Sequence, residues 1–172
     1  MKILQYLFIS LSHKILKILP YRLIRLLSVP IGTLYFLLTF RSSIKLFKRR
    51  KIFEKLKINY KPLIVKINYT RYWLETLWLT NKNFSKHITP HVEIENQEYV
   101  DKLKKQYPGL IFALPHLGNW EFAIPIGNSI KLNLLAVAEP LSNSYVLNWF
   151  KSLRESLGIE IIIGGKGQNT FD

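Results

Sequence analysis

The pattern of hydrophobic positions divides the chain into an N-terminal third with long apolar stretches and a remainder with short ones. Residues 1–19 are apolar with sparse lysines, and the longest uncharged run, Leu26–Phe40, has 15 residues with Pro30 and Gly32 inside it. A membrane-spanning helix needs about 20 apolar residues. The pattern therefore predicts a re-entrant or interfacial membrane element, and a buried helical hairpin packed on the rest of the domain is the alternative.

A helix and a linker are predicted next along the chain. Aromatic and aliphatic residues at mixed helical spacing predict a helix from about Pro62 to Leu79. The stretch Asn81–Pro90 is rich in Asn, Lys, Ser and Thr and is closed by proline, which is typical of a linker. The predicted organisation is a membrane-associating helical segment at 1–57, a helix and linker at 58–83, and the first part of an α/β domain at 84–172.

Strands and helices are expected to alternate in the remaining part of the chain. Short apolar runs bounded by turn residues predict strands at Val92–Ile94, Leu110–Leu114, Leu132–Ala138 and Ile159–Ile163. Longer amphipathic segments predict helices at Glu98–Gln106, Trp120–Ile130 and Ser144–Leu157. Apolar strands that alternate with helices favour an α/β fold, with a mostly parallel sheet, flanking helices and right-handed crossovers.

The net charge of +14 is concentrated in the apolar third of the chain. Residues 1–57 hold 13 of the 25 Lys and Arg residues and only one of the 11 acidic residues. Positive charge interleaved with Leu, Ile and Phe favours an anionic membrane surface, whereas nucleic-acid binders pair basic charge with a polar surface. The basic cluster Lys48–Lys51 directly follows the apolar segments, which is typical of a cytoplasmic juxtamembrane position; a solvated charged face is the alternative.

The composition also limits the chemistry. The chain has no cysteine, which excludes disulfides, thiolate nucleophiles and Cys-bound metals. Its four histidines lack metal-ligand spacing, and Thr89-Pro90 argues against a shared helical face for His87 and His91. We therefore expect no metal site.

The candidate chemistry lies in Leu114–Glu121, directly after a predicted strand. His116 falls in a tight loop with Gly118, Asn119 suits the N-cap of the next helix, and Glu121 lies in that helix's first turn, where the dipole favours a carboxylate. Open α/β sheets bind ligands at such strand ends. Glu121 could hold one ring nitrogen of His116 protonated, leaving the other free to take a proton from a hydroxyl.

The complete string His-Leu-Gly-Asn-Trp-Glu is more specific than a single histidine, which is more commonly a structural residue. It resembles the HX4D/E motif of glycerolipid and glycolipid acyltransferases, and more narrowly that of the lipid A late acyltransferases and the related phosphatidylinositol mannoside acyltransferases. The resemblance covers essentially the whole chain but only about the first half of the family. Because the chain ends soon after its last predicted strand, we expect a truncated sequence.

The resemblance implies transfer of an acyl chain from acyl-CoA or acyl carrier protein to a glycolipid hydroxyl. His116 would be the general base, and Glu121 would orient and charge-balance its imidazole. Arg154 would contact the developing oxyanion or an acceptor phosphate. Since no enzyme nucleophile is required, direct transfer in a ternary complex is expected. The remaining substrate contacts would come from Asn119, Glu139 and Asn143.

Two of these positions rest on finer features of the family. Arg154 stands before a glycine on a helix that follows Asn143 and carries Trp149, as in family members, although composition alone favours a solvated arginine. Glu139 stands where many lipid A enzymes have arginine before proline, and it resembles the phosphatidylinositol mannoside enzymes. Those enzymes often carry Asp where this chain has Glu121. The acceptor therefore stays open between a phosphatidylinositol mannoside and a lipid A precursor.

The expected location is the cytoplasmic face of the bacterial inner membrane, with anionic lipid as a partner and no nucleic acid. Two alternatives from other functional classes stay open. The first is a catalytically inactive, basic membrane-surface protein or fragment, in which His116 is structural. The second is a nucleic-acid binder that uses Lys45–Lys57, which would show strongly salt-dependent binding to DNA but not to anionic vesicles.

Overall fold

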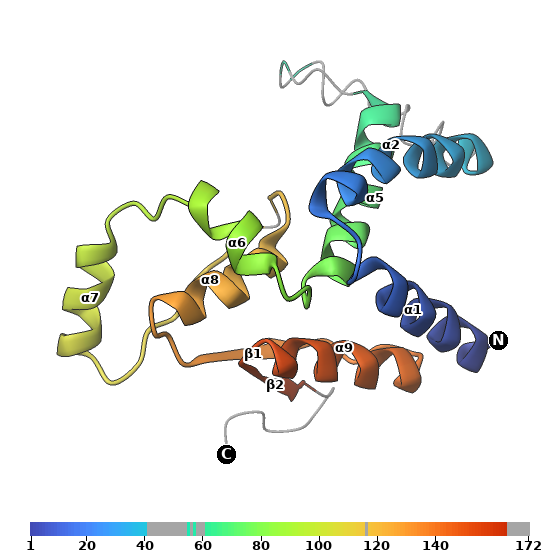
Figure 1. Ribbon diagram of the computed structural model, residues 1–172. Coiled ribbons are helices and arrows are strands. Elements are labelled where there is room, and N and C mark those ends of the chain that lie inside the picture. The colour runs from blue at the N-terminus through green and yellow to red at the C-terminus, as the bar shows by residue number, and fades with distance from the viewer. Residues whose placement is uncertain (41–54, 56, 58–60, 116, 165–172) are drawn as a thin grey trace.

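The computed structural model describes residues 1–40, 55, 57, 61–115 and 117–164, and helices make up most of this part of the chain (Figure 1). The helices are α1 (Lys2–Leu16), α2 (Tyr21–Leu38), α5 (Pro62–Trp78), α6 (Phe84–His87), α7 (Gln97–Gln106), α8 (Ala123–Ser129) and α9 (Ser144–Ser156). Two 3₁₀ turns are found at Thr89–His91 and Trp120–Phe122. The strands are β1 (Leu134–Ala138) and β2 (Ile159–Ile163).

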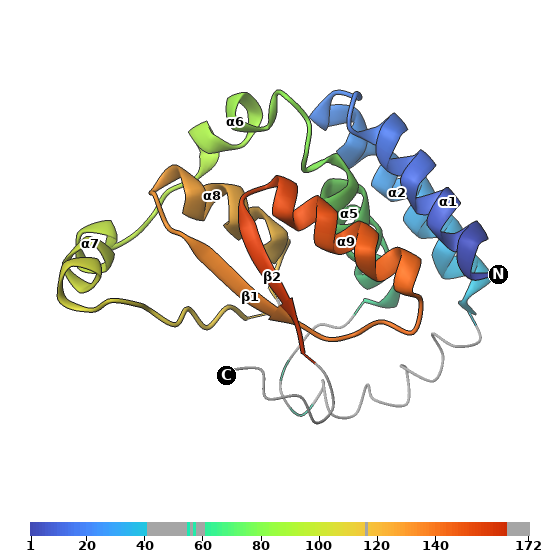
Figure 2. The same cartoon turned by 90° about the horizontal axis from the view of Figure 1, so that it is seen from below.

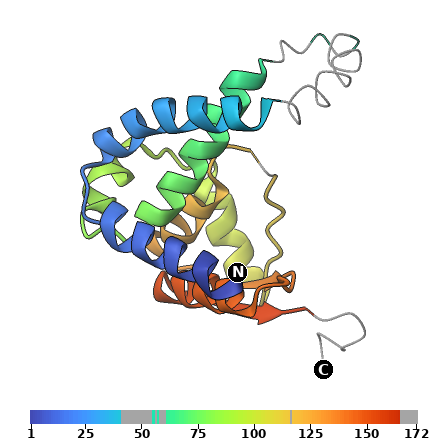
Figure 3. The same ribbon diagram turned by 90° about the vertical axis from the view of Figure 1, so that its right-hand side faces the viewer.

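The three N-terminal helices share one apolar core. α1 and α2 diverge from the short connection between them, and α5 runs between the two (Figure 3). Ile24 of α2 and Trp78 of α5 are both fully buried there, and the indole Nε1 of Trp78 donates a hydrogen bond to the carbonyl oxygen of Leu19 at 2.8 Å. The inner faces of α1 and α2 therefore pack on the domain, as the buried-hairpin alternative expects. The outer faces expose large apolar side chains, among them Leu4, Phe8, Leu11, Leu26, Leu34 and Leu38.

α2 continues without a break through Pro30 and Gly32, which lie inside the run predicted to be re-entrant or interfacial. By length and composition the helix could cross a membrane, since it has 18 residues with a mean hydropathy of 1.3 and only 17% of this window is buried. A core helix can meet the same criteria of length and composition. The position of α2 relative to a membrane therefore stays a prediction, and the basic cluster at Lys48–Lys51 lies outside the described residues.

α2 approaches α5 closely at Gly32. A Cβ atom at this position would lie 2.6 Å from the Cα atom of Ile67, closer than side chains come in folded proteins. We expect Gly32→Ala to lower the free energy of unfolding by about 1 kcal/mol, because overpacking costs about 1–3 kcal/mol and alanine's helix propensity returns about 1 kcal/mol. Denaturant unfolding in mild detergent measures this, with the exposed Leu34→Ala as control. A Gly32→Ala chain as stable as the original would contradict the close approach.

The stretch predicted as a linker is folded instead. Asn81–Pro90 contains α6 and the start of a 3₁₀ turn, and Phe84 and Ile88 are 7% and 8% exposed. These two side chains lie one helical turn apart and join the core around Trp78. The linker prediction is wrong because two apolar residues in a polar stretch are enough to bury one face of a short helix.

β1 and β2 form a parallel pair, with Leu134 opposite Ile159 and Ala138 opposite Ile163. α9 connects them and packs against β2. The helix begins at its predicted first residue, Ser144, where the side-chain oxygen of Asn143 accepts hydrogen bonds from the backbone at the start of α9. The parallel strand–helix–strand unit predicted from the sequence is confirmed in this part of the chain.

Two other predicted strands are wrong. Leu110–Leu114 is extended but forms no strand, and its Ile111 and Leu114 are 101% and 57% exposed. Val92–Ile94 lies in the loop before α7. An apolar run becomes a strand only when a neighbouring strand pairs with its backbone groups, and the sheet of the described residues contains only β1 and β2. The segment from α7 to the motif runs beside β1 without joining it (Figure 2).

The helices on either side of this extended segment were predicted more successfully. α7 at Gln97–Gln106 confirms the helix expected from Glu98. The helix expected at Trp120–Ile130 is divided into the 3₁₀ turn Trp120–Phe122 and α8. The structure therefore places the motif between an unpaired extended segment and a short helix, and its helical side packs against α5 and α9.

Candidate active site

The motif loop turns sharply and is capped by its own asparagine. The backbone N–H of Leu117 donates to the carbonyl oxygen of Pro115 at 2.8 Å, and Gly118 has a φ of 60°, a left-handed conformation that favours glycine. The side-chain oxygen of Asn119 accepts a hydrogen bond from the backbone N–H of Glu121 at 3.3 Å, which confirms the predicted N-cap. His116 lies outside the residues that the structure describes.

Glu121 is 1% exposed and forms a two-pronged ion pair with Arg154 of α9. The guanidinium Nε donates to Oε2 at 3.1 Å and Nη2 donates to Oε1 at 2.5 Å. The guanidinium carbon lies 5.3 Å from the centre of the Trp120 ring and 5.5 Å from that of Phe150, which flank it. Arg154 is therefore held by the motif itself, and its predicted contact with an oxyanion or an acceptor phosphate stays a prediction.

Tyr72 of α5 donates a further hydrogen bond to Glu121 Oε1 at 3.4 Å. Burial and the neighbouring Glu121 charge raise the pKa of Tyr72 to about 12. The phenol therefore stays protonated throughout the physiological range and remains a donor to the carboxylate. Together with Arg154, it satisfies a negative charge that would otherwise be costly to bury.

A second buried carboxylate lies close to the motif. Glu75 of α5 is 6% exposed, and its Oε2 accepts a hydrogen bond from Asn119 Nδ2 at 3.2 Å. Its Oε1 accepts one from the Tyr21 hydroxyl at 3.0 Å. Neither Glu75 nor Tyr72 was predicted from the sequence as part of the site. The available signal was a single acidic residue within the otherwise apolar end of a predicted helix.

The other two predicted substrate contacts lie elsewhere. Asn143 is 8% exposed, and its amide Nδ2 donates to the Lys2 carbonyl at 3.0 Å and to Gln5 Oε1 at 2.9 Å, while its oxygen caps α9. It therefore joins α1 to α9. Glu139 follows β1, is exposed and faces a groove. Neither residue makes a hydrogen bond or ion pair with Glu121 or Arg154 in the described part of the chain.

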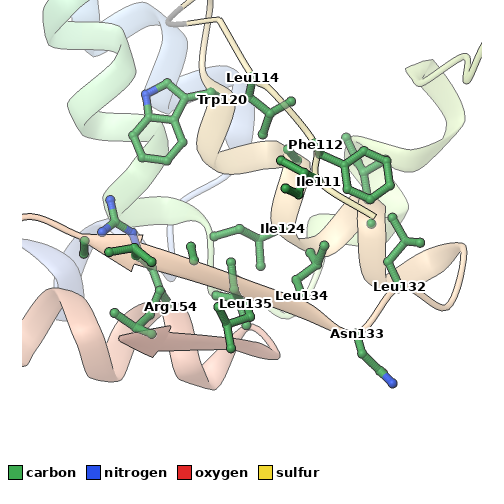
Figure 4. Close-up of a pocket in the computed structure, with 18 of the residues that line it drawn as sticks. Ile111, Phe112, Leu114, Trp120, Ile124, Leu132, Asn133, Leu134, Leu135 and Arg154 are labelled. Carbon is green, nitrogen blue, oxygen red and sulfur yellow. The ribbon is translucent and has the colours of Figure 1, made fainter. Parts of the chain in front are cut away.

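A groove of about 1190 Å³ lies between the extended segment Leu110–Leu114 and β1, with a mainly apolar lining. Trp120 and Arg154 lie on one side of it, and Phe112 and Leu132 on the other (Figure 4). The volume lies somewhat above the range of about 300–1,000 Å³ typical of ligand sites. The groove therefore offers an apolar surface that extends away from the Glu121–Arg154 pair.

The described residues contain no group of three His, Asp or Glu side chains that could hold a metal ion. What they provide is a buried, neutralised carboxylate in the motif, at Glu121, and a mainly apolar groove beside its partner Arg154. Such a site suits chemistry on a polar group carried by a long apolar chain.

Comparison with known proteins identifies one family. The sequence model of a family described as bacterial lipid A biosynthesis acyltransferase matches residues 1–169. No curated protein and no solved structure matches the chain significantly.

Proposed function

The chain belongs to the bacterial lipid A biosynthesis acyltransferase family, and on this premise we propose that it transfers a fatty acyl chain from a thioester to a glycolipid hydroxyl. Membership implies acyltransferase activity on a lipid A-type acceptor. The observation that carries the finer proposal is the buried Glu121–Arg154 pair at the side of a mainly apolar groove, directly after the loop that holds His116. The groove suits the acyl chain, and the loop suits the reacting groups.

In the proposed reaction, His116 takes the proton of the acceptor hydroxyl as its oxygen attacks the thioester carbonyl. The tetrahedral intermediate then collapses, the C–S bond breaks, and the leaving thiolate takes the proton from His116. The ester product and a free thiol leave the site. Glu121 holds the loop in place and provides a negative charge near the imidazole of His116. Arg154 forms an ion pair with this carboxylate. No covalent acyl–protein intermediate is needed, which suits a chain without cysteine.

The donor would be acyl-CoA or acyl carrier protein, without a metal or a resident cofactor. The acceptor would be a lipid A precursor or a phosphatidylinositol mannoside. Asn119, Glu139 and Asn143 are the further candidate substrate contacts, of which Glu139 is exposed along the groove. A transfer assay with each acceptor in turn, using a labelled acyl chain in mild detergent, tests the reaction and identifies the acceptor class.

We further propose that the chain works at the cytoplasmic face of the inner membrane. The exposed apolar faces of α1 and α2 support contact with lipid. Four basic residues near the connection between these helices are exposed and suit anionic headgroups. They are Lys14, Lys17, Arg22 and Arg25.

If the groove holds the acyl chain, the length of the groove should determine which acyl-chain length the enzyme prefers in its donor. We expect Leu132→Trp to fill the side of the groove away from Arg154 and to shift the preference toward shorter chains. Burying one methylene contributes about 0.8 kcal/mol, so each methylene excluded should lower kcat/KM about fourfold. A series of acyl donors of increasing length measures this.

Leu103→Trp is the matched control, because Leu103 lies on α7 and does not line the groove. It should leave the chain-length profile unchanged. An unchanged profile in a folded Leu132→Trp chain would place the acyl chain elsewhere, without affecting the proposed transfer reaction itself.

A further inference from the structure

We propose that Glu75 of α5 is a positioning residue, which holds residues Leu117–Glu121 of the motif loop in their reactive arrangement through the side chain of Asn119. This inference rests on the proposed acyltransferase function of the same loop. Glu75 does not belong to the HX4E motif and lies 44 positions from Asn119 in the sequence.

The contacts form a continuous connection from α5 to the backbone of the motif. The Glu75 carboxylate accepts from Asn119 Nδ2 at 3.2 Å, and Asn119 Oδ1 accepts from the backbone N–H of Glu121 at 3.3 Å. Both polar atoms of the Asn119 side chain are therefore engaged. In this orientation of the loop, the amide satisfies the Glu121 N–H and the Glu75 carboxylate together.

The charge of Glu75 explains why the hydrogen bond between Glu75 and Asn119 is favoured in the folded chain. Glu75 is 6% exposed, and the described residues place no Lys or Arg nitrogen within ion-pair distance of it. Its hydrogen bonds in this part of the chain come from two neutral donors, the Tyr21 hydroxyl and the Asn119 amide. A buried carboxylate is costly unless it is hydrogen-bonded. Loss of the Asn119 contact would leave the carboxylate with a single donor, so the folded chain favours the loop position that keeps it.

The surroundings favour positioning over a simple packing role. Glu75 lies among the buried residues Leu74, Leu77 and Trp78 of α5, where an apolar side chain would fill the space without the cost of a charge. α5 is packed firmly against α2, whereas the segment before the loop has no strand partner in the described residues. α5 can therefore hold the motif loop in place, which the sheet does not do because the segment before the loop is not one of its strands.

Glu75→Gln tests the connection in the full chain. Glutamine offers Asn119 a neutral amide oxygen in place of a carboxylate oxygen, and its amino group then faces the Tyr21 hydroxyl, which must accept instead of donate. The hydrogen bond from the Asn119 amide therefore loses the charge that strengthens it. We expect kcat for acyl transfer to fall about 10- to 100-fold, since small displacements of reacting groups have effects of this size, with KM changed less than about twofold. A rise in KM at unchanged kcat would overturn the inference and favour direct substrate contact by Asn119.

The matched rescue is the double variant Glu75→Gln/Asn119→Asp. In it the amino group of the new glutamine donates to the new carboxylate, whose other oxygen still accepts from the Glu121 N–H. We expect kcat of the double variant to exceed that of either single variant by at least about fivefold. If the fall in kcat of the double variant equalled the product of the falls in the two single variants, the inference would be overturned. Tyr21→Phe is the control, because it removes the other hydrogen bond of Glu75 and should leave kcat within about threefold of the original.

Should Glu75→Gln fail to fold, Asn119→Ser tests the same connection from the loop. Serine keeps the N-cap but is too short to reach Glu75. The same fall in kcat is expected in this variant, and an unchanged kcat would overturn the inference.

A second readout separates this inference from the proposed function. Hydrogen exchange of the Leu117–Glu121 amides should become at least about tenfold faster in Glu75→Gln and slower again in the double variant. This result holds whether or not the chain transfers acyl groups, so an original chain without transfer activity would reject the function alone. Unchanged exchange in Glu75→Gln would reject the positioning role even in an active enzyme.

Discussion

Replacing His116 by alanine is expected to reduce acyl transfer by about 10²–10⁴-fold, the usual contribution of a positioned general base. Without the imidazole, the acceptor hydroxyl must attack the thioester while still carrying its proton. Binding of donor and acceptor should change little, because the mainly apolar groove beside Arg154 is untouched. The loss should therefore appear in kcat rather than in KM, measured with a labelled acyl donor and a glycolipid acceptor.

The matched control is His91→Ala, which removes an exposed histidine on a 3₁₀ turn outside the groove. It should transfer acyl chains at the original rate. If His116→Ala remained folded and kept the original rate, the proposed acyltransferase mechanism would be wrong whatever the family membership.

The second large effect is expected from the buried ion pair. Arg154→Met removes the cation and leaves Glu121, 1% exposed, without its charge partner. Breaking a buried pair in this way costs about 3–5 kcal/mol, because an uncompensated charge stays inside the protein. We expect the free energy of unfolding to fall by about that amount and acyl transfer to be lost.

Two further variants separate charge from shape. Glu121→Gln/Arg154→Met removes both charges, so it should recover much of the stability lost in Arg154→Met while remaining inactive. Arg154→Lys keeps the charge but loses the two-pronged contact, and it should be clearly impaired. Denaturant unfolding of the original chain, Glu121→Gln, Arg154→Met and the double variant measures the coupling between the two charges. If the effects of the two single substitutions on stability were simply additive, the ion pair would contribute nothing.

Local patterns were sufficient to predict the elements whose stability is local. α9 was expected at Ser144–Leu157 and ends at Ser156, because an N-cap asparagine and a helical apolar face both lie within one stretch of sequence. β2 also matches its predicted bounds, and its partner β1 is only one helix away in the sequence. Leu110–Leu114 has an equally apolar sequence, but a strand also needs a partner. That requirement depends on contacts that its own residues do not determine.

In the site, too, residues within a local motif could be predicted from the sequence, whereas contacts between residues far apart in the sequence could not. Glu121 and Arg154 were both predicted as functional residues from the motif and its family resemblance. Their contact with each other was not predicted, because it joins residues 33 positions apart on different elements. Tyr72 and Glu75 were missed for the same reason, since they reach the motif across 49 and 44 positions. A charged residue in an apolar helix face signals a buried partner without identifying it.

The most direct test of the central claim is the stoichiometry of the transfer reaction. The chain is mixed in mild detergent with an acyl thioester and a glycolipid acceptor, and released thiol and acylated acceptor are measured together. We expect one acyl ester for each thiol, little thiol release without acceptor, and no acyl group left on the protein. A folded chain that binds anionic vesicles but leaves the acceptor unmodified would contradict it and favour a membrane-surface protein without catalytic activity.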